Sequence, residues 1–140
     1  MTTTTFSAPS ASKGLRIGLW VVQALLALLY VYSGLTKFFT PIPELSQMMP
    51  WTGAVPEGFV RFIGIVDFAA GLGFVLPALT RIQPQLTPLA ALGSTVLQIL
   101  AFSFHSYRGE FMVVPMNIVI LAGSIFVLWG RYKKAPIQAR

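Results

Sequence analysis

Cysteine is missing from the sequence, and among its 140 residues there are only one histidine and four acidic residues. Without cysteine the chain has no disulfide, no thiolate nucleophile and no CxxC redox motif. A single histidine and four scattered carboxylates also argue against a zinc or haem site built by the protein itself, so we expect no metal. The sequence holds no recognisable catalytic constellation, and it therefore leaves open whether the protein is an enzyme.

Charge of either sign is scarce. Charged residues make up 10% of the sequence, whereas a soluble domain carries about a quarter, and the mean hydropathy is +0.73. Four stretches are almost free of charge and long enough to cross a bilayer core of roughly 30 Å as helices. A membrane barrel is excluded because no alternation of polar and apolar residues is visible. We expect the spans at about 17–38, 58–76, 88–104 and 112–130.

These spans predict an all-α fold, an up-and-down four-helix bundle that forms one membrane domain over residues 17–131. Residues 1–16 are rich in Thr and Ser and are expected to be a disordered tail. Residues 132–140 form a basic tail. The apolar stretch after residue 16 is longer than that of a signal peptide, so we expect it to be retained as the first span.

Proline marks the connections between the predicted spans. Pro41, Pro43, Pro50 and Pro56 interrupt the first connection and leave room for one or two helical turns near 44–51, held by the membrane interface or by ordinary packing. The second span is expected to stop at Pro77.

The basic residues are distributed unevenly over the two sides of this arrangement. Such an excess of Lys and Arg orients a membrane protein with that side in the cytoplasm. We therefore expect both termini in the cytoplasm and a multi-pass protein of the cell inner membrane. The net charge of +6 is then a topology signal and does not predict nucleic-acid binding. The side of the termini holds Lys13, Arg16, Arg81, Arg131, Lys133, Lys134 and Arg140, and the other side holds Lys37, Arg61 and Arg108.

Each predicted span has one face of small and polar residues, because positions i, i+3, i+4 and i+7 share a side of a helix. Small residues let helices approach closely, and polar residues within a span are functional candidates by default. Helix packing alone also explains Ser94, Gln98, Asn117 and Ser124. The four faces are Gln23, Ala27, Tyr30, Ser33, Gly34 and Lys37; Gly64, Asp67 and Gly71; Ser94, Gln98, Ala101 and His105; and Asn117 and Ser124.

Depth along the helices predicts a polar pocket in the outer half of the bundle. At about 1.5 Å per residue, the deeper residues lie roughly 8–14 Å below the extracytoplasmic end. The candidate ligand-binding residues are Tyr30, Asp67, Gln98 and Asn117 at this depth, with Lys37 and His105 near the rim.

A carboxylate at this depth needs a partner. Arg61 lies six positions from Asp67 on the same helix, about 120° around it, so it faces another side of the helix and is not expected to be the partner. Lys37, Tyr30 and Gln98 are the remaining alternatives.

The stretch "FSFHSYRGEF" forms the predicted turn between the third and fourth spans. Gly109 suits a tight turn, Arg108 can snorkel to the headgroups, and Glu110 would stand near the N-terminus of the fourth helix. We expect His105 to differ from these three. It should point over the pocket mouth, toward the Lys37 end of the first span, where an imidazole can pass protons to outer water.

Three segments, "SGLTKF", "GIVDFAAGLGFVLPALTR" and "FHSYRGE", resemble the DoxX-like family of small four-helix membrane proteins. The resemblance covers about Leu29 to Arg131. The family commonly has glutamate where this chain has Asp67, and its histidine near the end of the third span is matched by His105. Some relatives are membrane subunits of thiosulfate:quinone oxidoreductases, others associate with redox or stress-response complexes, and distant eukaryotic relatives assist receptor assembly or cargo export.

The resemblance thus implies a membrane subunit linked to a redox complex, with a quinone or similar lipid-soluble ligand in the polar pocket. The alternative is a non-enzymatic partner that assembles or stabilises another membrane protein. Solute transport is disfavoured, because four helices rarely enclose a path without forming an oligomer. A membrane or redox partner protein and a homo-oligomer both remain open.

Overall fold

A computed structural model describes residues 12–139 of the chain. Its elements are α1 (Lys13–Phe39), α2 (Ile42–Met48), the short 3-10 helix η1 (Pro50–Gly53), α3 (Glu57–Thr80), α4 (Leu86–Tyr107), α5 (Val114–Trp129) and a π-helical turn η2 (Gly130–Lys134). The helices α1, α3, α4 and α5 with its continuation through η2 are long and apolar enough to cross a membrane. The predicted all-α fold with four spans is confirmed.

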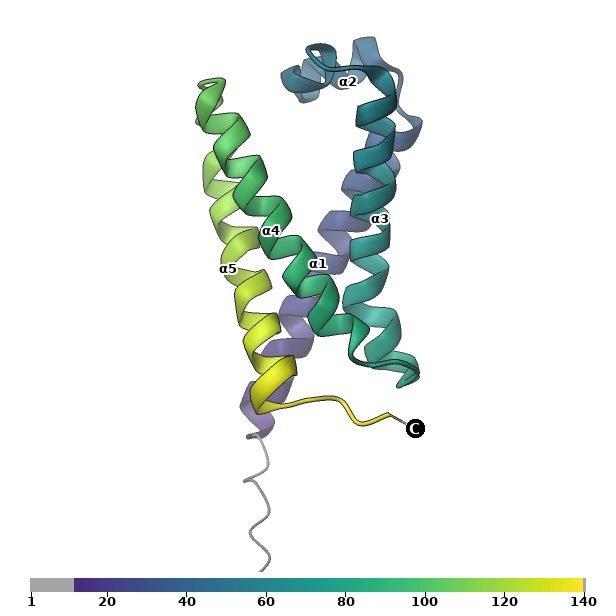
Figure 1. The fold of residues 1–140 in the computed structure, drawn as a ribbon, viewed down its shortest axis with the longest axis vertical. Helices are drawn as coiled ribbons and strands as arrows, with labels where there is room; N and C mark the ends of the chain where they lie inside the picture. Colours follow the sequence, from purple (N-terminus) through teal and green to yellow (C-terminus); the bar gives the residue numbers. More distant parts are fainter. Residues whose placement is uncertain (1–11, 140) are drawn as a thin grey trace, which may run out of the picture.

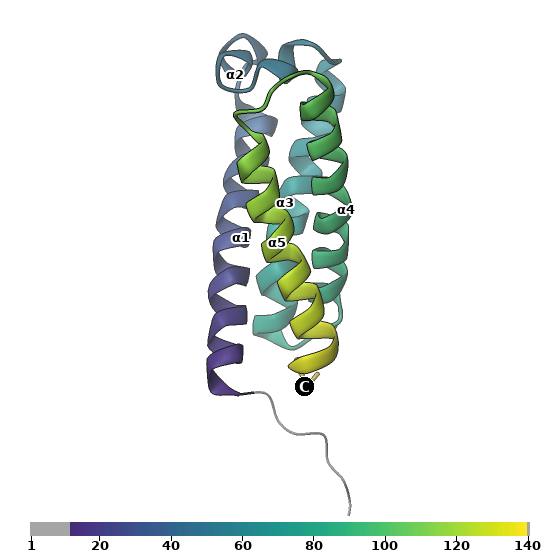
Figure 2. The same cartoon turned by 90° about the vertical axis from the view of Figure 1, so that its left-hand side faces the viewer.

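The four long helices form two pairs, α1 with α3 and α4 with α5. In Figure 1 the α4–α5 pair diverges from the α1–α3 pair toward the end of the bundle that carries α2 and η1. Figure 2 shows the same four helices running side by side from one end to the other. We call the end with α2 the α2 end and the opposite end, where α1 begins and α5 finishes, the terminal end. The halves of the bundle next to these ends are the α2 half and the terminal half.

Glycine brings α1 and α3 into close contact along their length. A Cβ atom on Gly34 would lie 2.6 Å from the backbone nitrogen of Phe68 and 2.7 Å from the carbonyl oxygen of Gly64. A Cβ on Gly71 would lie 3.0 Å from the carbonyl oxygen of Ala27. The small residues of these two faces therefore do let the helix backbones meet, as the sequence pattern indicates.

The boundaries of the second span differ from the prediction. Pro77 does not stop the helix, because α3 continues through it to Thr80. Proline leaves the carbonyl of residue i−4 without its helical donor, and here that carbonyl belongs to Gly73. The Thr87 hydroxyl on α4 donates to the Gly73 oxygen at 3.1 Å. A side chain of a neighbouring helix thus replaces the missing bond, which allows a proline within a membrane span.

Other boundaries shift by a few residues. Helix α1 begins at Lys13, so residues 13–16 of the expected tail are helical, and α5 begins at Val114. Residues 1–11 of that tail, and Arg140 of the basic tail, lie outside the described residues. The connection at 40–56 holds two short helices, each preceded or begun by proline.

Buried polar residues tie the helices together at the terminal end. The Gln23 amide on α1 donates to the carbonyl oxygen of Phe74 on α3 at 2.6 Å, and Arg131 of η2 donates to the Gln23 oxygen at 2.7 Å. Arg131 also donates to the carbonyl oxygen of Ala135 at 2.9 Å. Only 5% of Arg131 is exposed, so this residue is a packed part of the bundle as well as one of its basic charges.

Candidate ligand-binding site

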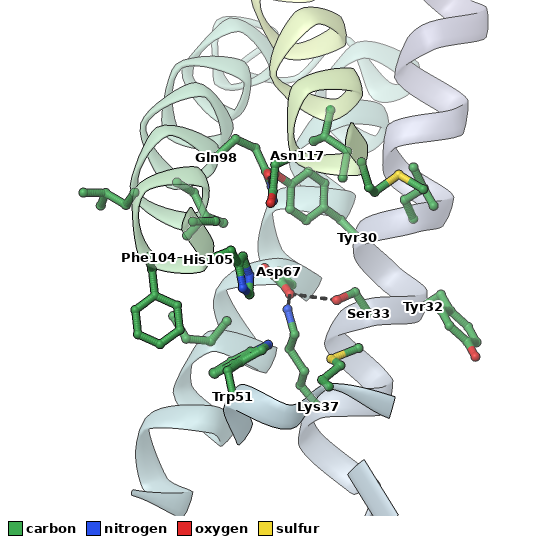
Figure 3. A pocket seen from close by; sticks show the side chains of 18 of the residues that line it. Tyr30, Tyr32, Ser33, Lys37, Trp51, Asp67, Gln98, Phe104, His105 and Asn117 are labelled. Atoms are coloured by element: carbon green, nitrogen blue, oxygen red, sulfur yellow. Dashed lines mark hydrogen bonds and ion pairs between the residues drawn. The ribbon is translucent and has the colours of Figure 1, made fainter. Parts of the chain in front are cut away.

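A pocket of about 620 Å³ lies in the α2 half of the bundle, between the two helix pairs. All four long helices and η1 contribute to its wall. The structure brings together on this one wall all six residues expected from the sequence: Tyr30, Lys37, Asp67, Gln98, His105 and Asn117. Figure 3 shows most of the wall around the dashed contacts of Asp67. Whether these residues bind a ligand remains a prediction.

Lys37 is the partner of Asp67. Its ammonium nitrogen lies 2.7 Å from Asp67 Oδ2, and the side chains are 14% and 3% exposed. The Ser33 hydroxyl donates to the same oxygen at 3.0 Å. Since Gly34 and Gly64 hold α1 and α3 together, a lysine one turn from Ser33 can reach across to α3 and neutralise the carboxylate within the membrane. Ser33 was identified as part of the polar face but not as a partner of Asp67.

Arg61 points away from Asp67, as its position on the helix predicts. It lies 3.1 Å from Glu57, and it donates to the carbonyl oxygens of Lys37 and Thr40 at 2.8 and 2.7 Å. These carbonyls are at the end of α1, where no intrahelical donor remains. Arg61 therefore caps α1 and is not part of the pocket wall.

Tyr30 and Gln98 belong to a hydrogen-bonded chain at the deep end of the pocket. Asn117 Nδ2 donates to Gln98 Oε1 at 2.8 Å, and Gln98 Nε2 donates to the Tyr30 hydroxyl at 2.9 Å. Tyr30 is bonded in turn to Ser94, and Ser94 to Ser124. This chain joins α1, α4 and α5, so these residues both pack the helices and form the floor of the pocket.

The mouth of the pocket is formed by Trp51 of η1 and by the end of α4. The Trp51 ring meets the rings of Phe104 and His105 edge-on, at centroid distances of 6.2 and 6.4 Å, and the Lys37 ammonium lies 5.6 Å from its centroid. Trp51 therefore bridges the two helix pairs where they diverge. The sequence predicts only one or two helical turns near 44–51. The contacts of Trp51 depend on how α2 and η1 fold back over the bundle.

His105 lines the pocket, on the Lys37 side, as expected. Its Nδ1 lies 3.1 Å from the Glu110 carboxylate, which also accepts from Arg108 at 2.9 Å. The fourth helix begins later than the expected residue 112, at Val114, so Glu110 lies four positions before it. Glu110 instead holds the turn together, with Gly109 at a φ of 75°.

The remaining wall is apolar. Such a surface, with a few convergent polar groups, is typical of sites for small molecules. The polar groups include the Lys37–Asp67 ion pair and the His105 imidazole. The apolar lining residues include Leu29, Phe59, Ile63, Leu97, Leu100 and Ile120.

Comparison with known proteins adds one finding. The model of the DoxX-like family matches residues 21–127, which is more than half of the chain. Neither the curated proteins nor the solved structures gave a match. The matched range contains every residue of the pocket wall.

Proposed function

Because this chain belongs to the DoxX-like family, we propose that it is a multi-pass protein of the cell inner membrane that binds a quinone-like, lipid-soluble molecule as a membrane subunit linked to a redox complex. The head group would occupy the pocket of the α2 half, and Lys37, Asp67 and His105 would bind it. The apolar tail would extend between the diverging helix pairs.

The pocket itself is the observation that supports this proposal. Its 620 Å³ falls in the range of about 300–1,000 Å³ of small-molecule sites. Several apolar wall residues have exposed side chains, among them Leu29, Phe59 and Leu100. A ligand dissolved in the bilayer would therefore meet apolar side chains on its way to the ion pair.

The test is to purify the full chain in mild detergent and to identify the extracted small molecules by mass spectrometry. We expect a quinone or a chemically similar lipid, lost in Trp51→Ala. The matched control is Trp129→Ala, at the terminal end and 42% exposed, which should retain the molecule. A protein that carries only phospholipid, and that does not bind added quinone after reconstitution, would contradict the proposal.

The proposed orientation has its own test. Reporter domains fused after Arg140 and within residues 40–57 should report opposite sides of the membrane, with the C-terminal fusion in the cytoplasm. Reporters on the same side would contradict the arrangement of four spans.

A groove between α3 and α4 favours the second candidate, an assembly partner of another membrane protein. It is lined mainly by small residues, among them Ala69, Ala70, Gly73, Ala90 and Gly93. Small residues allow a further helix to approach closely. A Cβ on Gly93 would meet nothing within 4 Å, so Gly93→Leu should fill the groove and prevent co-purification of a partner without disturbing the fold. Cross-linking would show whether that partner is a second copy of the chain.

A further inference from the structure

The hydroxyl hydrogens around the floor of the pocket are already engaged within the protein. Ser124 donates to the carbonyl oxygen of Ile120 at 2.7 Å. A hydroxyl has one hydrogen, so Ser124 must accept from Ser94, and Ser94 must accept from Tyr30. Tyr30 then has no hydrogen left for Gln98 and can only accept from it, which is the direction the structure shows.

The direction of this chain determines which atom is left without a partner. Since Gln98 donates through its nitrogen, its oxygen faces Asn117 and accepts from the Asn117 amide nitrogen. Asn117 Oδ1 is buried and accepts no hydrogen bond from the described residues. The residue lines the pocket and is 9% exposed. The floor of the pocket therefore has no hydroxyl hydrogen left to offer a ligand, and the chain ends in a buried acceptor that is costly to leave unsatisfied.

The ion pair leaves a second free acceptor. Ser33 and Lys37 both donate to Asp67 Oδ2, and within residues 12–139 no hydrogen bond reaches Oδ1. The Ser33 hydroxyl hydrogen is used in the same contact. Lys37 keeps N–H groups beyond the one that bonds Asp67. One free carboxylate oxygen and a free ammonium hydrogen therefore belong to the same pair on the pocket wall.

We infer that the pocket selects ligands that donate a hydrogen bond through an O–H or N–H group, and so binds the reduced, hydroxyl-bearing form of a quinone-like molecule in preference to the oxidised form. This inference rests on the proposed function. A hydroxyl accepts from Lys37 and donates to Asp67 Oδ1 at once, whereas a carbonyl only accepts and would place its oxygen against a carboxylate.

The test compares two probes of similar shape, para-decylphenol and para-decylanisole, in which a methoxy group replaces the hydroxyl and can accept a hydrogen bond but cannot donate one. Binding to the full chain in lipid nanodiscs is measured as the part of the tryptophan fluorescence change that Trp51→Phe removes. Because hydrogen bonds to charged groups are the stronger ones, we expect the phenol to bind about tenfold more tightly or better. Asp67→Asn should reduce the ratio of the two affinities.

Ser103→Ala is the control, because the Ser103 hydroxyl donates only to the carbonyl of Ile99 on its own helix. The ratio should be unchanged in this variant. Equal binding of the phenol and the anisole would overturn the inference while leaving the proposed pocket intact. Binding of neither probe would overturn both. If Asp67→Asn unfolds, the affinity ratio of the two probes for the wild-type protein still decides the question.

Discussion

In the α2 half of the bundle a partly buried cation, Lys37, meets a carboxylate, whereas in the terminal half the buried cation Arg131 meets an amide and a carbonyl. Every acidic residue of the chain, Glu44, Glu57, Asp67 and Glu110, belongs to the α2 half. In the terminal half, Gln23 connects α1 to both α3 and η2.

This difference suggests that the two halves of the bundle have different roles. Neutral hydrogen-bonding partners join three helices in the terminal half, where the helix pairs converge. The Lys37–Asp67 pair joins only α1 and α3. The α4–α5 pair is free to diverge from them, as Figure 1 shows. The pocket lies between the two helix pairs, beside the ion pair. We therefore expect substitutions in the terminal half to lower stability alone, and substitutions of pocket-wall residues in the α2 half to change ligand binding as well.

The largest effect is expected for Asp67→Leu. It leaves the partly buried Lys37 ammonium without its counter-charge, which costs up to about 3–5 kcal/mol when such a pair is fully buried. Thermal unfolding in detergent would measure the loss. Asp67→Asn keeps hydrogen-bonding capacity and should lose less, and the double variant Lys37→Met with Asp67→Leu should recover much of the stability. A single Leu variant as stable as wild type, with unchanged ligand binding, would remove any role for Asp67.

Gly34→Ala tests the α1–α3 contact that both halves share. The new Cβ would lie 2.6 Å from a backbone nitrogen of α3, so the helices must move apart, at a cost of about 1–3 kcal/mol. Gly93→Ala is the matched control, because its Cβ meets nothing within 4 Å. Equal unfolding temperatures for the two variants would show that the close approach of α1 and α3 is unimportant.

Gln23→Leu tests the terminal half. It removes the acceptor of Arg131 and should cost about 1–3 kcal/mol, since a buried charged donor is left unsatisfied. Ligand binding in the distant pocket should remain as in wild type. Loss of binding together with stability would contradict the division between the halves.

Thr87→Val should have a smaller effect. It removes the donor to the Gly73 carbonyl that Pro77 leaves free, and hydrogen bonds between membrane helices average about 0.6 kcal/mol. Thr95→Val is the control, because Thr95 bonds only a carbonyl of its own helix. The unfolding temperature of the first variant should fall below that of the second.

The smallest effects on stability are expected at the turn after α4. Arg108→Ala breaks a partly exposed ion pair with Glu110, which is worth about 0.2–1 kcal/mol, and it should leave ligand binding unchanged. His105→Ala should instead weaken ligand binding or alter its pH dependence, because this ring lines the pocket. Binding that is insensitive to His105 but sensitive to Arg108 would reverse these assignments.

Much of the architecture could be predicted because it depends on local properties of the chain. Runs without charge determine where helices cross a bilayer, and the 3.6-residue repeat determines which side chains share a helix face. Those two rules were enough to place Tyr30, Lys37, Asp67, Gln98, His105 and Asn117 near one another. The same repeat was enough to exclude Arg61 as the partner of Asp67.

Other features depend on which helix lies next to which. The choice of Lys37 over Tyr30 or Gln98 required the close approach of α1 and α3, and the continuation of α3 past Pro77 required Thr87 on α4. The positions of Glu110 and Trp51 depend on how the connections fold. By itself, the sequence determined the spans and their polar faces, since hydrophobic length and helical periodicity act within one segment. Only the tertiary structure decided the partners and the shape of the pocket, since hydrogen bonds and ion pairs between helices form over a few ångströms between segments far apart in the chain.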